Sequence, residues 1–235
     1  MSSGGGAFKG ILFKIGTSIG NVEKTKMTAE FNDSVQCYES YREKLGPLVD
    51  RLEGAVQQHP DVLKSNNMES PPNENPHELL ACSLEIFKTY QAEDRVPALN
   101  DFISQRRKLA VCQRDGQLKA RKAIRHLRRF FRVEYTEMRT ENEKLTKIRD
   151  YMDMIKHDVK TAKNTEQIEK SALLYEEAVE NFNHQAKRVI DLLDKLPSIQ
   201  KSHMDEIVEF FEVMKKNNAD LGQRINVYSH CKSVA

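Results

Sequence analysis

Apolar residues recur at steps of three and four positions through two long stretches of this 235-residue chain. That spacing places them on one side of an α-helix, and its persistence over six or more heptads is typical of coiled-coil packing rather than of a compact bundle. The first stretch runs from Ala120 to Ala162 and the second from Ile168 to Tyr228. Helices of this kind must pack along their length, against each other or against a second chain.

The predicted helices are far longer than those of ordinary globular domains. About 85 residues at a rise of 1.5 Å give a helix of about 130 Å, whereas globular helices average about 11 residues. No segment alternates with a period of two, so strands are not expected. We therefore expect an all-α fold of three long, kinked helical tracts with coiled-coil packing. The expected elements are an N-terminal segment over 1–21 and a helical domain over 22–232, with helices over about 22–58, 77–163 and 166–229 and an insert or loop over 59–76.

Proline positions refine this outline. Four of the seven prolines lie within residues 59–77, together with several Asn and Ser, which is typical of a loop or a partly ordered insert. Pro47, Pro97 and Pro197 lie inside the expected helices, where a proline removes one backbone hydrogen bond. We expect them to bend the helices without ending them, which predicts an elongated, curved rod.

The composition fits long amphipathic helices. Hydrophobic residues make up 39% and charged residues 31% of the chain, which is too polar for a thick core and too apolar for a disordered chain. The four cysteines are scattered without a CxxC pair, so we expect free thiols in a reducing cytoplasm. No apolar run approaches the ~18 residues of a membrane span. The chain is expected to be cytoplasmic and to meet membranes only at their surface.

The first 20 residues contain no acidic side chain and carry an apolar stripe. On a helical wheel five apolar residues fall within about 100° of one another, with two lysines outside the stripe. Gly10 and Gly16 weaken a helix by up to ~1 kcal/mol each, so we expect this segment to fold when it inserts into lipid, with its lysines on anionic headgroups. The alternative is an apolar arm that docks on the protein. The stripe consists of Phe8, Ile11, Leu12, Ile15 and Ile19, and the lysines are Lys9 and Lys14.

A second feature is the basic segment 106–132, which contains eleven Lys or Arg and one acid, Asp115. The rest of the chain is net acidic, because the total charge is only +2. Basic clusters on a helix gain about 1 kcal/mol per side chain near an anionic bilayer, and salt screens that gain. The expected headgroup-binding residues of this segment are Arg114, Arg121, Lys122, Arg125, Arg128, Arg129 and Arg132.

Two other interpretations of the basic segment stay open on the motif alone. The same charges, with the neighbouring Phe130 and Phe131, could contact the phosphates and bases of a nucleic acid. The arginines could instead form a solvated helix face that pairs with acids of the third helix. A further cluster, Lys156, Lys160 and Lys163, precedes the turn between the second and third helices. These lysines would either bind lipid at the tip of a hairpin or keep an exposed turn soluble.

No motif for catalysis or cofactor binding is present. The sequence lacks a P-loop, an HExxH and a GxSxG, and its seven His and four Cys show no metal-ligand spacing. We therefore expect a protein that is not an enzyme and that needs neither a cofactor nor a metal ion.

Several local stretches resemble the endophilins, in the right order along almost the whole chain. They are GNVEKTKMTAEF at 20–31, HPDVL at 59–63, NPHELL at 75–80 and KIRDYMD at 147–153, and they are similar to the B-type branch more than to the A-type. Two features differ from that family. The insert around 64–76 is polar rather than apolar, and recruitment of proline-rich partners through an SH3 domain is not expected from these 235 residues.

The resemblance implies an N-BAR domain, which is a crescent-shaped homodimer of three-helix antiparallel coiled coils. It implies that the helix Phe8 to Ile19 inserts into one leaflet, that concave charges fall among Arg114 to Arg132, and that the lysines from Lys156 to Lys163 lie at the tips. The implied function is sensing or inducing membrane curvature during membrane trafficking such as endocytosis. The expected partners are anionic phospholipid membranes and a second copy of the chain, not nucleic acid. The alternative is a cytoplasmic coiled-coil adaptor for a protein such as a small GTPase.

Overall fold

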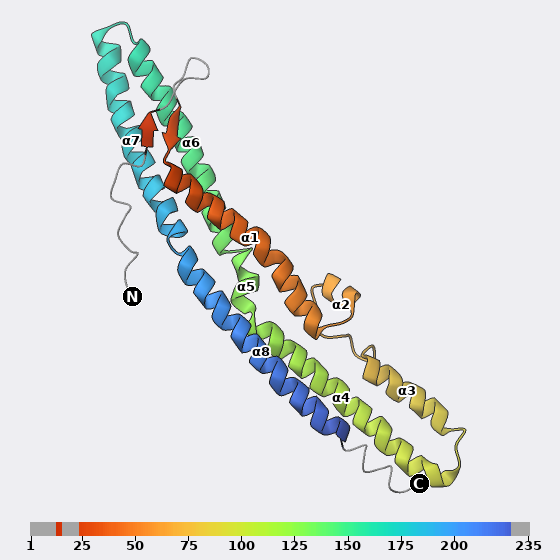
Figure 1. Cartoon of the computed structure of the whole chain (residues 1–235). Coiled ribbons are helices and arrows are strands. Elements are labelled where there is room, and N and C mark those ends of the chain that lie inside the picture. The colour runs from red at the N-terminus through yellow and green to blue at the C-terminus, as the bar shows by residue number, and fades with distance from the viewer. Residues whose placement is uncertain (1–12, 16–23, 227–235) are drawn as a thin grey trace, which may run out of the picture. The chain divides into compact units, whose positions relative to one another are not determined.

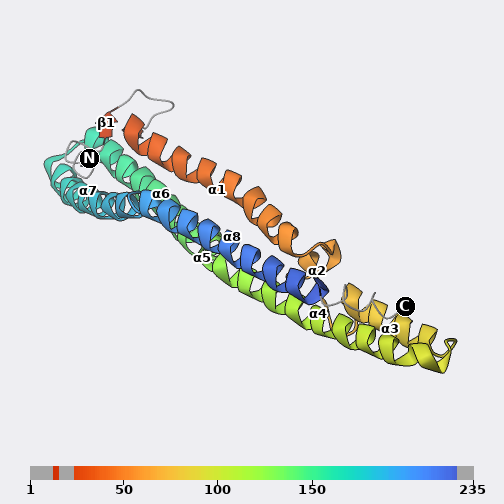
Figure 2. The ribbon, with the colours of Figure 1, turned by 60° about the horizontal axis from the view of Figure 1, so that its bottom comes forward.

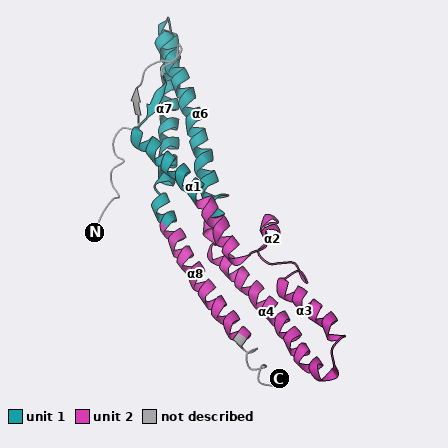
Figure 3. Cartoon of the chain, turned by 45° about the vertical axis from the view of Figure 1, so that its right-hand side comes forward, with its two compact units in different colours: residues 1–44, 129–200 teal, residues 45–128, 201–235 magenta. Residues whose placement is uncertain are grey.

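The computed structural model describes residues 13–15 and 24–226, and nearly all of them are helical (Figure 1). The chain forms two compact units (Figure 3). Unit 1 consists of residues 1–44 and 129–200, and unit 2 of residues 45–128 and 201–235. Long helices that pack side by side confirm the all-α coiled-coil fold expected from the apolar periodicity.

Unit 1 is built on a hairpin of two long helices, α6 and α7, which pack against each other along their length. The first half of α1 lies in the same unit, as does a small antiparallel sheet. The elements of unit 1 are β1 (Phe13–Ile15), β2 (Thr25–Met27), the first part of α1 (Ala29–Val56), the end of α5 (Arg125–Phe130) from residue 129, α6 (Glu134–Thr161), α7 (Thr165–Leu193) and the start of α8 (Leu196–Asn226) up to residue 200.

Unit 2 is built on a second hairpin, in which α3 lies along α4 (Figure 2). The remainder of α1, a short helix within the insert and most of α8 complete this unit. Its elements are the end of α1, α2 (Pro60–Lys64), α3 (Pro76–Lys88), the 3-10 helix η1 (Glu93–Arg95), α4 (Val96–Ala123), the start of α5 (Arg125–Phe130) and α8 (Leu196–Asn226) from residue 201.

Most positions of the predicted apolar stripes are buried. Leu127, Phe182 and Phe210 have no measurable exposure, and most of the predicted stripe positions around them are buried or half-buried. Ile168 is an exception, because it lies exposed near the start of α7. The buried stripe of α6 and α7 consists of Met138, Leu145, Met152, Ile155, Ala178, Phe182, Ala186 and Val189.

Phe130 organises the core of unit 1. Its ring stacks on Tyr38 at 5.6 Å between centroids and meets Tyr41 and Phe131 edge-on at 5.5 and 5.8 Å. Burial, followed by the charge of Glu134, raises the pKa of Tyr38 to about 12, so this phenol is neutral at physiological pH. We expected Phe131 in the apolar stripe, but breaks around Ile124 and residues 131–133 shift the register by one residue.

The continuous helix expected over 77–163 is interrupted. The chain turns back between α3 and α4, so residues 76–88 belong to a separate helix that packs on α4. Asn75 starts α3 with a capping box to Glu78, and Pro76 occupies the first turn, where its missing N–H costs nothing. A further break at Ile124, with φ −100° and ψ 28°, separates α4 from α5.

The prolines act differently from the expectation. Pro97 and Pro197 lie in the first turns of α4 and α8, so they begin helices instead of bending them. Proline is favourable there because the first amides of a helix have no intrahelical partner. Pro47 lies inside α1, which runs through it without ending.

The insert over 59–76 contains one short helix, α2. The absence of strands was a wrong expectation, because two short strands are present. Phe13, Lys14 and Ile15 pair with Met27, Lys26 and Thr25. Strands of three residues are too short to produce a detectable period-two pattern.

We expect Phe130→Ala to lower the free energy of unfolding by about 3–5 kcal/mol, because the aromatic cluster loses its central ring and a cavity remains. Chemical denaturation measures this change. The matched control is Tyr151→Ala, which truncates a half-exposed ring of the same unit and is expected to cost less than about 1 kcal/mol. Similar costs for both variants would contradict the assigned core.

Candidate functional site

A buried carboxylate holds the break in the middle of the basic segment. Both oxygens of Glu206, on α8, accept the backbone N–H of His126 at 3.1 and 3.0 Å, and one also accepts that of Leu127 at 2.9 Å. The Nδ1 atom of His126 lies 2.7 Å from the same carboxylate. A negative charge at the first amides of α5 is favourable, since helix N-termini carry unpaired donors. Glu206 thereby stabilises the new helix that starts at Arg125.

Two arginines of the basic segment turn toward the protein. The guanidinium of Arg128 lies 2.8 Å from the carboxylate of Glu53 on α1, and that of Arg121 lies 3.5 Å from the same oxygen. Both also donate to the side-chain oxygen of Asn66 in the insert, at 2.9 and 2.8 Å. Asn66 adopts a left-handed conformation with φ 59°, which asparagine tolerates well. These arginines therefore hold the insert onto α1 and α4.

Arg114 makes a third contact of the same kind. Its guanidinium donates two hydrogen bonds to Glu78, at 2.5 and 2.6 Å, and two more to the carbonyl oxygens of Ser70 and Pro71. The hydrogen bonds from Arg114 hold the pKa of Glu78 below its ordinary value. Because Glu78 also caps α3, this one arginine ties the end of the insert to the start of the α3–α4 hairpin.

The predicted headgroup-binding residues of the basic segment thus divide into two groups. Arg114, Arg121 and Arg128 follow one another at steps of seven, which places them on one side of the helix, and all three pair with acids. The acids belong to α1 and α3, not to the third helix as the solvated-face interpretation expected. The second group faces solvent and consists of Lys122, Arg125, Arg129 and Arg132.

One of the two aromatic rings that the nucleic-acid interpretation requires is not accessible. Phe130 is fully buried in the aromatic cluster, so its ring does not present a face on which a base could stack. Phe131 is half-buried and packs edge-on against Phe130.

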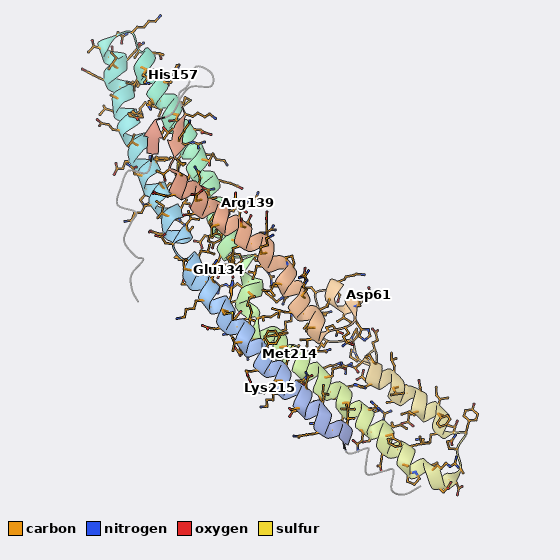
Figure 4. The ribbon with its side chains drawn as sticks, viewed as in Figure 1. Asp61, Glu134, Arg139, His157, Met214 and Lys215 are labelled. Carbon is orange, nitrogen blue, oxygen red and sulfur yellow. The ribbon has the colours of Figure 1, made fainter. Side chains whose placement is uncertain are left out.

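The lysine cluster lies where the sequence placed it, at the turn between two long helices. Lys156 and Lys160 are on the last turns of α6, and Lys163 is in the connection to α7. Lys160 and Lys163 are exposed, and Lys156 is half-buried. Figure 4 labels His157 at this end of α6.

The N-terminal expectations fall mostly outside the described residues. Phe8, Ile11, Leu12, Ile19 and Lys9 lie there. Lys14 and Ile15 belong to β1, so residues 13–15 are extended here instead of helical. The antiparallel pairing with β2 satisfies backbone groups that a helix would otherwise satisfy internally.

Sequence reasoning missed the residues that engage the arginines, namely Glu53, Asn66 and Glu78. Their contacts join positions between 36 and 75 residues apart, and no local pattern reveals them. One signal was available. Arginines at steps of seven beside an apolar stripe face a packed neighbour, whereas those at intermediate positions face water.

The described residues contain neither a metal-binding cluster nor a membrane-spanning helix. Among the described side chains, no group of three His, Cys, Asp or Glu residues is arranged to hold a metal ion. Within residues 13–15 and 24–226, every helix is too short or too polar to cross a membrane.

We expect Arg114→Ala to lower the free energy of unfolding by about 1–3 kcal/mol at neutral pH, since Glu78 and two carbonyl oxygens lose their donor. The folded-state pKa of Glu78 is lowered, so the part of this stabilisation that comes from the ion pair is present at neutral pH and is lost as the pH falls through that pKa, whereas the hydrogen bonds to the two carbonyl oxygens remain. Urea unfolding at neutral pH and in acid measures the difference. Arg125→Ala, at an exposed position, is the control and should change stability by at most about 0.5 kcal/mol. An Arg114 effect that is independent of pH would contradict the assignment.

Comparison with known families agrees with this architecture. The model of the family described as BAR domain matches residues 12–225. No curated protein matches the chain. BAR domains are in general non-enzymatic helical scaffolds that dimerise and bind lipid membranes. The match includes both helical hairpins, the basic segment and the lysine cluster, and on this evidence the chain belongs to the BAR domain family.

Proposed function

We propose that this chain is an N-BAR-type scaffold, similar to the endophilins, which binds anionic membranes as a crescent-shaped dimer and senses or induces their curvature. The observation that carries the proposal is the group of solvent-facing cations on either side of the α4–α5 break, in a chain that belongs to the BAR family. The activity is physical. Cations on a curved face bind best where the bilayer matches that curvature, and the inserted N-terminal segment adds apolar burial and widens one leaflet.

The exposed cations are the headgroup-binding residues that we propose. Lys122 and Arg125 lie in unit 2, and Arg129 and Arg132 lie in unit 1. A guanidinium or ammonium in water moves to a lipid phosphate at little cost in desolvation, whereas one in a shielded pair must first leave its carboxylate. Arg129 lies 3.5 Å from Glu134, but this pair is solvent-exposed and therefore weak. We assign Arg114, Arg121 and Arg128 to the support of the unit 2 cations Lys122 and Arg125, because they fix the insert and α3 within the same unit.

The lysine cluster at the α6–α7 turn supplies a second contact. Lys160 and Lys163 are exposed at the end of a hairpin, where a bilayer can approach without meeting the helix sides. We propose that these lysines and Lys156 bind headgroups at the tip. We also propose that the segment Phe8 to Ile19 gives up the pairing of β1 with β2 at the membrane and folds there as the inserted helix, with Lys9 and Lys14 at its lipid surface.

A second copy of the chain is the partner that the apolar surface of unit 2 favours. On α8, Met204, Val208 and Phe211 follow at steps of four and three and are each more than half exposed. The same helix buries Phe210, so it carries one stripe toward its own chain and another toward solvent. Exposed apolar stripes of this kind are typical of protein interfaces. Others in unit 2 are Leu79, Leu80, Ile86 and Phe87 on α3 and Val111 and Leu118 on α4.

Charge reversal tests the lipid surface. We expect Lys122→Glu with Arg125→Glu to weaken binding to phosphatidylserine-containing vesicles roughly 30-fold or more, since each cation contributes about 1 kcal/mol and each glutamate repels the surface. Co-sedimentation at fixed salt measures this. Lys215→Glu with Lys216→Glu changes the net charge equally, on α8, and should have a much smaller effect. Equal losses in both variants would indicate a non-specific charge effect.

The adaptor alternative makes a different prediction. Saturable binding of a protein partner, together with vesicle binding that does not depend on lipid charge, would favour it.

Aspartates in the exposed stripe test the dimer. We expect Val208→Asp with Phe211→Asp to raise the dimer dissociation constant roughly 100-fold or more, because two unpaired charges would be buried at the interface. Analytical ultracentrifugation measures the oligomeric state. Leu173→Asp with Leu174→Asp places the same charges at exposed positions of α7 in unit 1 and should leave the dimer intact. A wild-type chain that sediments as a monomer at micromolar concentration would refute the dimer.

A further inference from the structure

Unit 1 buries a carboxylate that the basic surface does not use. Asp153, on α6, is 2% exposed and lies among the core residues Met152 and Ile155. One of its oxygens accepts the backbone N–H of Thr25 at 2.7 Å, and the other accepts the Thr25 hydroxyl at 2.5 Å. Thr25 is itself 4% exposed, and the two residues lie 128 positions apart. A single residue near the N-terminus therefore occupies both oxygens of a buried acid.

This contact is selective for Thr25 within its strand. Lys24 before the strand and Lys26 within it are both exposed, so Thr25, the first residue of β2, is the one that turns toward α6 at this point. A buried carboxylate is costly unless its oxygens are hydrogen-bonded, and Thr25 supplies both donors. The beginning of α1 is held separately, because the Thr28 hydroxyl accepts the backbone N–H of Phe31 at 3.2 Å. The Asp153 contact thus fixes the chain before α1 begins.

The position of the anchor places the N-terminal segment close to the lysine cluster. Asp153 precedes the end of α6 at Thr161 by eight residues, or about 12 Å at 1.5 Å per residue. Ile15, the last residue of β1, pairs directly with Thr25, so this part of the insertion segment lies beside the anchor. The base of the insertion segment is thereby confined near the end of the α6–α7 hairpin.

We propose that Asp153, through Thr25, is the positioning residue that fixes where the N-terminal insertion segment leaves the helical body. This inference rests on the proposed function, because it assigns a place to the membrane-inserting segment. With the anchor intact, the N-terminal segment inserts into lipid while it stays attached to α6, close to the lysine cluster at the α6–α7 turn. Without it, β2 loses its attachment to α6. Once β1 leaves β2 for the membrane, residues 21–28 become a linker of up to about 27 Å, and the segment inserts without a fixed position.

Limited trypsin digestion at Lys24 and Lys26 tests the anchor. We expect cleavage to be at least tenfold faster in Asp153→Ala and in Thr25→Val, because β2 loses its attachment to α6. Thr25→Ser keeps the hydroxyl and should be cleaved within twofold of the wild-type rate. Asp158→Ala, at an exposed position five residues along α6, is the matched control and should also be unchanged. Circular dichroism shows whether each variant folds. If Asp153→Ala does not fold, the cleavage rate of Thr25→Val alone decides whether the anchor exists. Wild-type cleavage of folded Thr25→Val would overturn the anchor.

Vesicle assays with phosphatidylserine and phosphatidylcholine test the positioning role. For Thr25→Val we expect binding within twofold of wild type and tubulation at least threefold lower, with recovery in Thr25→Ser. A merely structural defect would lower both. Deletion of residues 1–20 is the reference, since it removes the wedge itself. If that deletion leaves tubulation unchanged, the insertion part of the proposed function fails. If the deletion lowers tubulation while Thr25→Val does not, only the positioning inference fails.

Discussion

Long helices with narrow apolar stripes impose the constraint on which the rest of this structure depends. A helix such as α6 or α7 cannot bury its stripe alone, so each must lie along a neighbour for its whole length. In unit 1 the α6–α7 hairpin meets this need with residues such as Phe182 and Val189, and Phe130 joins the first half of α1 to it. In unit 2 the apolar stripe that includes Phe211 stays exposed to solvent among the described residues. This exposure is the reason for proposing that a second copy of the chain covers it.

The pairing of charges then decides which cations are available. A contiguous basic segment suggests a single surface, but carboxylates at Glu53 and Glu78 divide it. The arginines that pair with them organise the insert and the start of α3, and Glu206 stabilises the helix break between them. The remaining cations face water on both sides of that break. Paired and solvent-facing cations therefore alternate along this one stretch of sequence.

The fold class was predictable from the sequence, whereas several features of the fold and the site were not. Apolar steps of three and four are local, so they identified the buried positions around Phe182 and the turn near Lys163. The α3–α4 turn escaped prediction because residues 89–95 contain neither Gly nor Pro and resemble helix. The partners of Arg128 and the link between Thr25 and Asp153 join residues 75 and 128 positions apart, and only the folded chain brings them together.

Vesicle co-sedimentation over a series of anionic-lipid fractions and vesicle diameters tests the central claim most directly. If the exposed cations bind anionic headgroups, the bound fraction rises steeply with phosphatidylserine content and falls with added salt. At fixed lipid composition it reaches a maximum at one range of vesicle diameters. Binding that is indifferent to lipid charge and to vesicle diameter would contradict the claim that this BAR domain uses its exposed cations to hold a curved bilayer.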